Sequence, residues 1–119
     1  MIKLLAWFTR ITGLIALILG FFLWQGRFPG TLRLHMTLGA LVAAYLVMIS
    51  LAAGFARVRP PMALVGLLWA AATVYVGMKQ NIMMPGSSHW VIEVVHVLLG
   101  VGAIGLVEML AGAYSRQKG

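Results

Sequence analysis

The feature that most constrains this chain is the length of its apolar runs. Stretches of about twenty residues with very few charged side chains recur along the sequence, separated by short segments that carry proline or glycine. A helix of about 20 apolar residues crosses the hydrocarbon core of a bilayer and satisfies its own backbone hydrogen bonds there. The runs therefore predict an all-α integral membrane protein.

The runs predict four helices in a single transmembrane domain. We place them at residues 4–24, 31–55, 62–79 and 88–114, within one domain that covers 1–119. Short connections make successive helices antiparallel neighbours, so we expect an up-down-up-down four-helix bundle. The first run is longer than the apolar part of a signal peptide and no cleavage-site pattern follows it, so we expect it to be retained as a span.

Composition narrows the class of function. Only 9% of the residues are charged, whereas soluble domains carry about a quarter. The net charge of +7 comes from basic residues that flank the apolar runs, which indicates contact with lipid headgroups and not with nucleic acid. The absence of cysteine excludes disulfides, iron–sulfur clusters and covalently attached haem.

The basic residues also predict an orientation. One side of the predicted bundle carries Lys3, Arg10, Arg57, Arg59, Arg116 and Lys118. The opposite side carries Arg27, Arg33 and Lys79. Cytoplasmic segments are enriched in lysine and arginine, so both termini are predicted to lie on the cytoplasmic side of the cell membrane.

Two stretches of the sequence share one local pattern. LHMTLG places His35 four residues before Gly39, and VHVLLG places His96 four residues before Gly100. Each follows a loop with a Pro-Gly pair, so the chain is consistent with two tandem hairpin repeats related by a pseudo-twofold axis along the membrane normal. Chance similarity between two apolar segments is the alternative.

The two histidines are predicted to lie at nearly one depth in the bilayer. Arg57 follows His35 by 22 residues, and Arg116 follows His96 by 20 residues. At about 1.5 Å of rise per residue, the two imidazoles differ in depth by about 3 Å. Two neutral imidazoles that face inward from parallel helices at one depth are what a bis-histidine haem b requires. The pair therefore predicts a haem near the non-cytoplasmic face, with both histidines as iron ligands.

Nearby residues fit the same hypothesis. Gly39 and Gly100 lie one turn from the histidines, where a residue without a Cβ lets a flat ring approach the helix backbone. Arg33 lies near the predicted outer surface with Arg27 and Lys79 on the same side, and each of the three is a candidate partner for the haem propionates. The alternative is helix packing without a cofactor, because small residues four apart are a common packing device in membranes and membrane histidines also hydrogen-bond between helices.

In this respect the chain resembles four-span membrane b-type cytochromes. Cytochrome b561-like proteins and the haem-carrying anchors of respiratory dehydrogenases also present ligand histidines from the spans of a four-helix bundle, often with nearby glycines. The residues that carry the resemblance are His35, Gly39, His96 and Gly100. It implies electron transport in a respiratory chain. The chain is shorter than those cytochromes and lacks a second histidine pair, so a second haem is not expected.

Further ionisable residues leave several interpretations open. His89, Glu93 and His96 share one face of the last predicted helix, which is compatible with a mononuclear metal site. A dinuclear carboxylate site is excluded because the chain has only two acidic residues. Glu93 is also placed to hydrogen-bond a ligand histidine, to pair with Lys79 or Arg33, or to exchange a proton with a quinone.

The second acid has a predicted partner. By helical rise, Arg10 lies about 21 Å from the outer end of the first predicted helix, and Glu108 lies about 27 Å along the last one. These helices are neighbours in the expected bundle, so we predict a structural Arg10–Glu108 ion pair that avoids leaving either charge alone in lipid. The alternative is a proton-carrying Glu108 in a small transporter.

These expectations favour an electron-transfer subunit over an enzyme that acts alone. It would hold one haem b and exchange electrons with a quinone or with a partner redox subunit. A cofactor-free accessory subunit of a larger membrane complex is the first alternative, and a small proton-coupled transporter is the second.

Overall fold

The computed structural model describes residues 2–24, 29–79 and 89–118, and this part of the chain contains helices and no strand. The elements are α1 (Ile2–Trp24), the short 3₁₀ helix η1 (Pro29–Thr31), α2 (Leu32–Phe55), α3 (Pro60–Lys79) and α4 (His89–Lys118). The predicted all-α class with four long helices is confirmed.

All four α-helices are long and apolar enough to cross a membrane. Large apolar side chains point outward on every one of them, including Phe8, Leu34, Leu68 and Leu98, which are at least half exposed. An outward-facing apolar surface of this kind is stable in lipid and not in water. The chain is therefore a multi-pass membrane protein.

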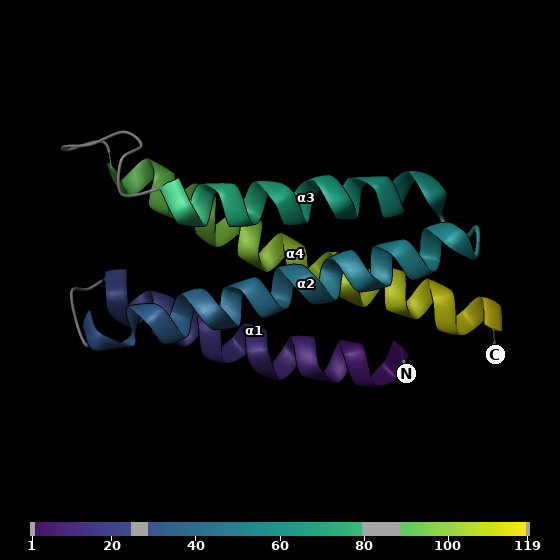
Figure 1. Ribbon diagram of the computed structural model, residues 1–119, viewed down its shortest axis with the longest axis horizontal. Coiled ribbons are helices and arrows are strands. Elements are labelled where there is room, and N and C mark those ends of the chain that lie inside the picture. The colour runs from purple at the N-terminus through teal and green to yellow at the C-terminus, as the bar shows by residue number, and fades with distance from the viewer. Residues whose placement is uncertain (1, 25–28, 80–88, 119) are drawn as a thin grey trace.

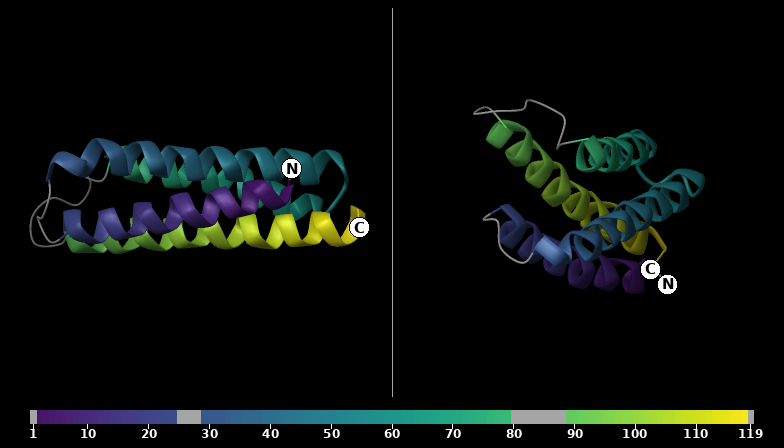
Figure 2. Two further views of the ribbon diagram at one scale, coloured as in Figure 1. Left: turned by 90° about the horizontal axis from the view of Figure 1, so that it is seen from below. Right: turned by 60° about the vertical axis from the view of Figure 1, so that its left-hand side comes forward.

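Sequential helices run antiparallel, and both termini lie at the same end of the bundle (Figures 1 and 2). Each of α2 and α4 contacts all three other helices, whereas among the described residues α1 and α3 do not meet. The cross-section is thus a rhombus in which α2 and α4, parallel to one another, form the short diagonal. The two histidine-bearing helices therefore pack directly against each other.

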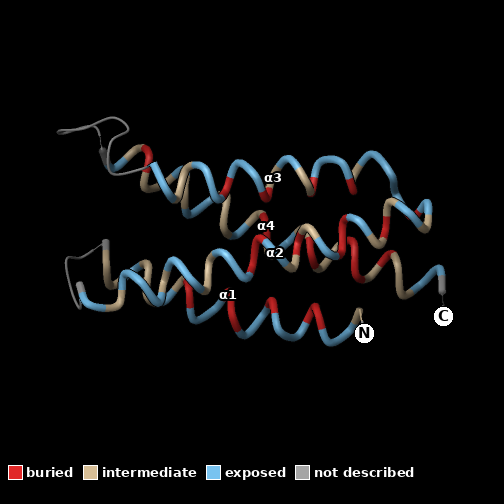
Figure 3. The backbone as a smooth tube through the Cα atoms, viewed as in Figure 1, coloured by how far each residue is buried: buried red, intermediate tan, exposed pale blue. Residues whose placement is uncertain are grey.

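The two ends of the bundle differ in packing. The fully buried side chains Leu46, Ile49, Val107 and Leu110 belong to the halves of α2 and α4 nearer the termini. Figure 3 shows buried positions concentrated toward that end. Toward the other end, the α1–α2 hairpin and the α3–α4 hairpin diverge (Figure 1).

The turn between α2 and α3 is built by backbone hydrogen bonds. The amide of Val58 donates to the carbonyl of Ala53 at 2.8 Å, and the amide of Arg57 donates to Gly54 at 3.1 Å. This is the Schellman arrangement, in which the residue after the helix cap adopts a left-handed conformation. Arg57 does so, with φ of 58°. Val58 is buried beside the helix end that it closes.

Several helix boundaries differ from those predicted by one to four residues, and two of these differences have a clear physical reason. α3 begins at Pro60 and not at residue 62, because proline is well suited to the first turn of a helix, where its missing N–H costs nothing. α4 continues to Lys118, beyond the predicted end at residue 114. Its last residues are polar, so an apolar run does not reveal that the helix continues out of the bilayer.

A tryptophan links α3 to α4 next to the histidine region. The indole Nε1 of Trp69 donates to the carbonyl of Leu99 at 2.8 Å. Gly102 makes room for this ring, since a Cβ there would lie 2.5 Å from a ring carbon. The hydrogen bond satisfies a donor that hydrocarbon cannot serve.

Candidate functional site

The structure brings His35 and His96 together between α2 and α4. Their ring centroids are 6.2 Å apart, and their planes are inclined by 79°. Both residues are partly buried, at the end where the two hairpins diverge. Histidines 61 positions apart in the sequence therefore form one local pair.

The ring of His35 is held by the neighbouring helix. Its Nδ1 lies 2.9 Å from the carbonyl oxygen of Ala16 in α1. Because a carbonyl only accepts hydrogen bonds, Nδ1 is the donor, and the lone pair of the neutral ring resides on Nε2. This contact orients a metal-ligating histidine in many proteins, since it fixes both tautomer and ring direction.

The ring of His96 presents a polar atom without a partner. Among the residues that the structure describes, nothing hydrogen-bonds its Nδ1, although that atom is buried. An unsatisfied buried polar group costs about 1–3 kcal/mol. An imidazole with a buried, unbonded nitrogen therefore has a polar group that a bound molecule can satisfy.

Each histidine packs against a glycine of the other helix in its hairpin. A Cβ added at Gly20 in α1 would lie 2.9 Å from Cε1 of His35. A Cβ added at Gly77 in α3 would lie 2.9 Å from Cε1 of His96. Such contacts are too short for real side chains, so neither position has room for a larger residue while the ring stays in place. Sequence reasoning missed both glycines.

The two glycine–histidine contacts have nearly the same geometry. The hypothetical Cβ atoms lie 3.5 and 3.6 Å from the two Nδ1 atoms, and 3.6 Å from Nε2 in both cases. The hairpins thus repeat one local arrangement, as the tandem-repeat prediction expects.

A cavity of about 540 Å³ adjoins the two imidazoles. Its walls come from all four helices and are mostly apolar. Gly39 and Gly100 line it, and no atom lies within 4 Å of a Cβ built at either position. The two glycines of the His-x-x-x-Gly pattern therefore enlarge this space and do not serve close helix packing. A volume of this size is within the usual range of about 300–1,000 Å³ for ligand sites.

The cavity has one acidic wall residue. Glu93 lines it from α4, three residues before His96, where α2 has Leu32 three residues before His35. The two halves of the site thus differ in charge at an otherwise matching position.

Other predicted site residues lie away from the imidazoles or outside the described residues. Arg33 is exposed on α2 and is not part of the cavity wall. Lys79 is exposed at the end of α3, and Arg27 falls outside the described residues. His89 begins α4, but its side chain is also outside the described part. Across residues 2–24, 29–79 and 89–118, no group of three histidine or acidic side chains converges on one point.

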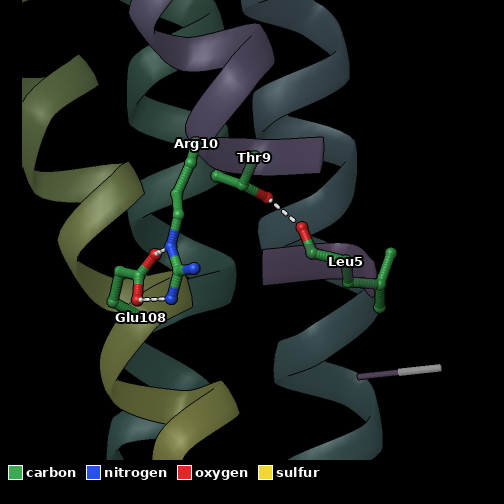
Figure 4. Close-up of polar contacts among 4 residues, drawn as sticks. All are labelled: Leu5, Thr9, Arg10 and Glu108. Atoms are coloured by element: carbon green, nitrogen blue, oxygen red, sulfur yellow. Dashed lines mark hydrogen bonds and ion pairs between the residues drawn. The ribbon is translucent and has the colours of Figure 1, made fainter. Parts of the chain in front are cut away.

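Near the opposite end, Arg10 of α1 meets Glu108 of α4 (Figure 4). Nε and Nη2 donate to the two carboxylate oxygens at 2.5 and 2.8 Å. The guanidinium also lies 4.8 Å from the centre of the Trp7 ring. A two-point contact of this kind fixes both planar groups, so these residues form a structural link between the first and last helices.

The comparisons add no family assignment to this geometry. Neither a protein-family model, nor a curated protein, nor a solved structure matches the chain.

Proposed function

We propose that this protein is a membrane b-type cytochrome that holds one haem between His35 and His96. The observation that carries the proposal is the separation of the two imidazoles, 6.2 Å between ring centroids, beside a cavity walled by glycine. The fit can be tested in three respects: separation, ring chemistry and space.

The separation would suit two imidazoles that bind the same metal ion. A metal–imidazole bond is about 2 Å long, and the ring centre lies about 1 Å beyond its nitrogen, so two such rings have centres about 6 Å apart. Direct packing of two imidazoles does not require this distance, because T-shaped aromatic pairs span about 4.5–7 Å. The separation is therefore compatible with packing alone and matches ligation closely.

The ring chemistry favours ligation. The carbonyl of Ala16 leaves Nε2 of His35 with its lone pair, which is the state that binds iron. The buried Nδ1 of His96 has no partner within the described residues, so this ring also has unused bonding capacity. Imidazole is a common haem ligand.

The space next to the histidines suits a flat apolar group. Side chains at Gly39 and Gly100 would project into the cavity, where nothing now lies within 4 Å. The wall is mostly apolar, which suits the face and edges of a porphyrin.

A bound haem supplies reversible one-electron transfer between ferric and ferrous iron. The protein positions the two ligands, excludes water with apolar walls and orients His35 through Ala16. Phe21, Leu32 and Val97 line the cavity and are 57, 49 and 37% exposed, so the cavity reaches the lipid-facing surface. This access favours electron exchange with a membrane quinone or with a partner redox subunit.

The basic-residue distribution completes the proposal. Both termini lie in the cytoplasm, and the haem site lies toward the other face of the cell membrane. Arg33 is exposed on the haem side of the bundle and remains the proposed partner of the propionates. A transporter that uses Glu108 is less favoured because Arg10 engages both of its carboxylate oxygens.

The test is the absorption spectrum of purified protein from haem-replete cells. We expect a Soret band and the reduced α band of low-spin haem b. His35→Ala and His96→Ala should each lose the low-spin spectrum, because each removes an iron ligand. His89→Ala is the matched control and should keep it. A colourless wild-type protein would reject the proposal and leave the cofactor-free accessory subunit as the better hypothesis.

A further inference from the structure

We propose that Gly20 and Gly77 are positioning residues that hold the imidazole planes of His35 and His96 nearly perpendicular to each other. The inference rests on the proposed haem site and adds a property of it, the relative orientation of the two histidine rings that would hold the haem. It is carried by the 79° angle between the rings and by the two glycine contacts.

The plane of each imidazole ring is fixed from outside its own helix. An imidazole on a helix has two free torsions, and the second one is broad, so the helix alone does not set the ring plane. The Cε1 atom of each ring lies where a Cβ on the facing glycine would approach to 2.9 Å. Each ring therefore packs on the bare backbone of a neighbouring helix, which limits its plane, and the hydrogen bond to Ala16 limits the plane of His35 as well.

The two rings pack against different outer helices. α2 and α4 run parallel and lie side by side, but the rings lean on different outer helices, His35 on α1 and His96 on α3. Since α1 and α3 lie at opposite corners of the rhombus, the helix surfaces at Gly20 and Gly77 face different directions. The angle between the two ring planes is 79°, close to a right angle.

The angle between the two imidazole planes changes the electron paramagnetic resonance spectrum of a bis-histidine haem, even though the ligands stay the same. In low-spin ferric haem with two imidazole ligands, perpendicular ring planes bring the iron d orbitals close in energy. They produce a highly anisotropic electron paramagnetic resonance signal with a single large g value. Parallel planes separate the orbitals and give a rhombic signal with three resolved lines. The wild-type protein should therefore show the highly anisotropic signal.

Alanine variants test whether the contacts at Gly20 and Gly77 hold the two rings. Gly20→Ala and Gly77→Ala place a methyl group against His35 and His96, respectively, so the affected ring must turn or shift. Because the angle starts near perpendicular, a large rotation moves the planes toward parallel and lowers the highest g value. Gly105→Ala is the matched control, since Gly105 also lies within a helix and has no atom within 4 Å of a Cβ.

Haem content is measured on the same samples by the Soret band. The inference is supported if wild type and the Gly105→Ala control both show the highly anisotropic signal. In the two variants, the largest g value should then fall, or the low-spin signal should disappear. If the variants lose haem and the control keeps it, the role of the two glycine contacts is supported. The wild-type signal then shows whether the imidazole planes are perpendicular. A rhombic signal from haem-loaded wild type overturns the inference and leaves the proposed function intact. Unchanged signals in both loaded variants overturn the glycine assignment, whereas wild type without haem overturns the proposed function as well.

Discussion

Individual residues in the α2–α3 turn adopt conformations that their side chains disfavour. Arg57 and Arg59 have φ values of 58° and 46°, in the left-handed region. The left-handed conformation costs a residue with a Cβ about 1–2 kcal/mol of conformational free energy, whereas glycine adopts it without this cost. The turn nevertheless forms because its hydrogen bonds close α2 and because Val58 is buried beneath it.

We predict that Arg57→Gly stabilises the protein. Removing the left-handed penalty should outweigh the greater freedom of glycine in the unfolded chain and raise the free energy of unfolding by about 0.5–1 kcal/mol. Unfolding in mixed detergent micelles measures this change. Arg57→Ala is the control, because it removes the same charge but keeps the Cβ. An equal gain in both variants would show that charge, and not φ, is responsible.

At the residue scale, the sequence predicted the histidines and their cavity glycines but missed the glycines beneath the rings. Gly39 and Gly100 stand four residues after a histidine in both halves, so a local pattern reveals them. Gly20 and Gly77 precede their histidines by 15 and 19 residues, so no common spacing links them to the rings. Their role depends on which face of α1 packs against His35 and which face of α3 packs against His96. Helix packing, and not a local sequence pattern, decides these faces.

At the scale of the helices, the apolar runs predicted the number and order of the spans. They predict the ends of a helix less well. The thickness of the bilayer limits the length of the apolar run, but the helix can continue beyond it. α4 illustrates this, since its polar segment 115–118 stays helical beyond the predicted end. The contact of Arg10 with Glu108 was accessible to sequence reasoning because helical rise fixes depth and neighbouring spans were expected to touch.

We predict that Glu108→Gln destabilises the bundle. The substitution leaves the Arg10 guanidinium without a counter-charge within the membrane-spanning part of α1, so we expect a lower free energy of unfolding. The double variant Arg10→Leu with Glu108→Leu should recover most of this loss, because it leaves no charge in the hydrocarbon. Unfolding measured under identical detergent conditions compares them. A double variant as unstable as the single one would mean that the ion pair itself, and not an isolated charge, sets the stability.

At the scale of the whole molecule, the antiparallel arrangement places both termini and the α2–α3 turn at one end (Figure 1). That end carries Lys3, Arg57, Arg59 and Arg116, all described as exposed. The haem site proposed here lies toward the other end. Orientation in the membrane therefore decides which compartment is nearer to the proposed haem site.

We predict that Gln117 faces the cytoplasm and Gly30 faces the opposite side. The chain contains no cysteine, so a single introduced thiol can be labelled without background. In intact cells, a membrane-impermeant maleimide should label Gly30→Cys and leave Gln117→Cys unmodified until the membrane is permeabilised. Both positions are exposed, so both thiols should react after permeabilisation. The reverse labelling order would contradict the predicted orientation.

The uneven packing along the bundle has a consequence for biogenesis. Leu46, Ile49, Val107 and Leu110 hold α2 and α4 together at the end away from the cavity, so closure of that end does not depend on what fills the space between the histidines. In the proposed cytochrome, membrane insertion and cofactor loading are then separate events, and loading comes last. A cell starved of haem would accumulate an assembled apoprotein that remains competent to be filled.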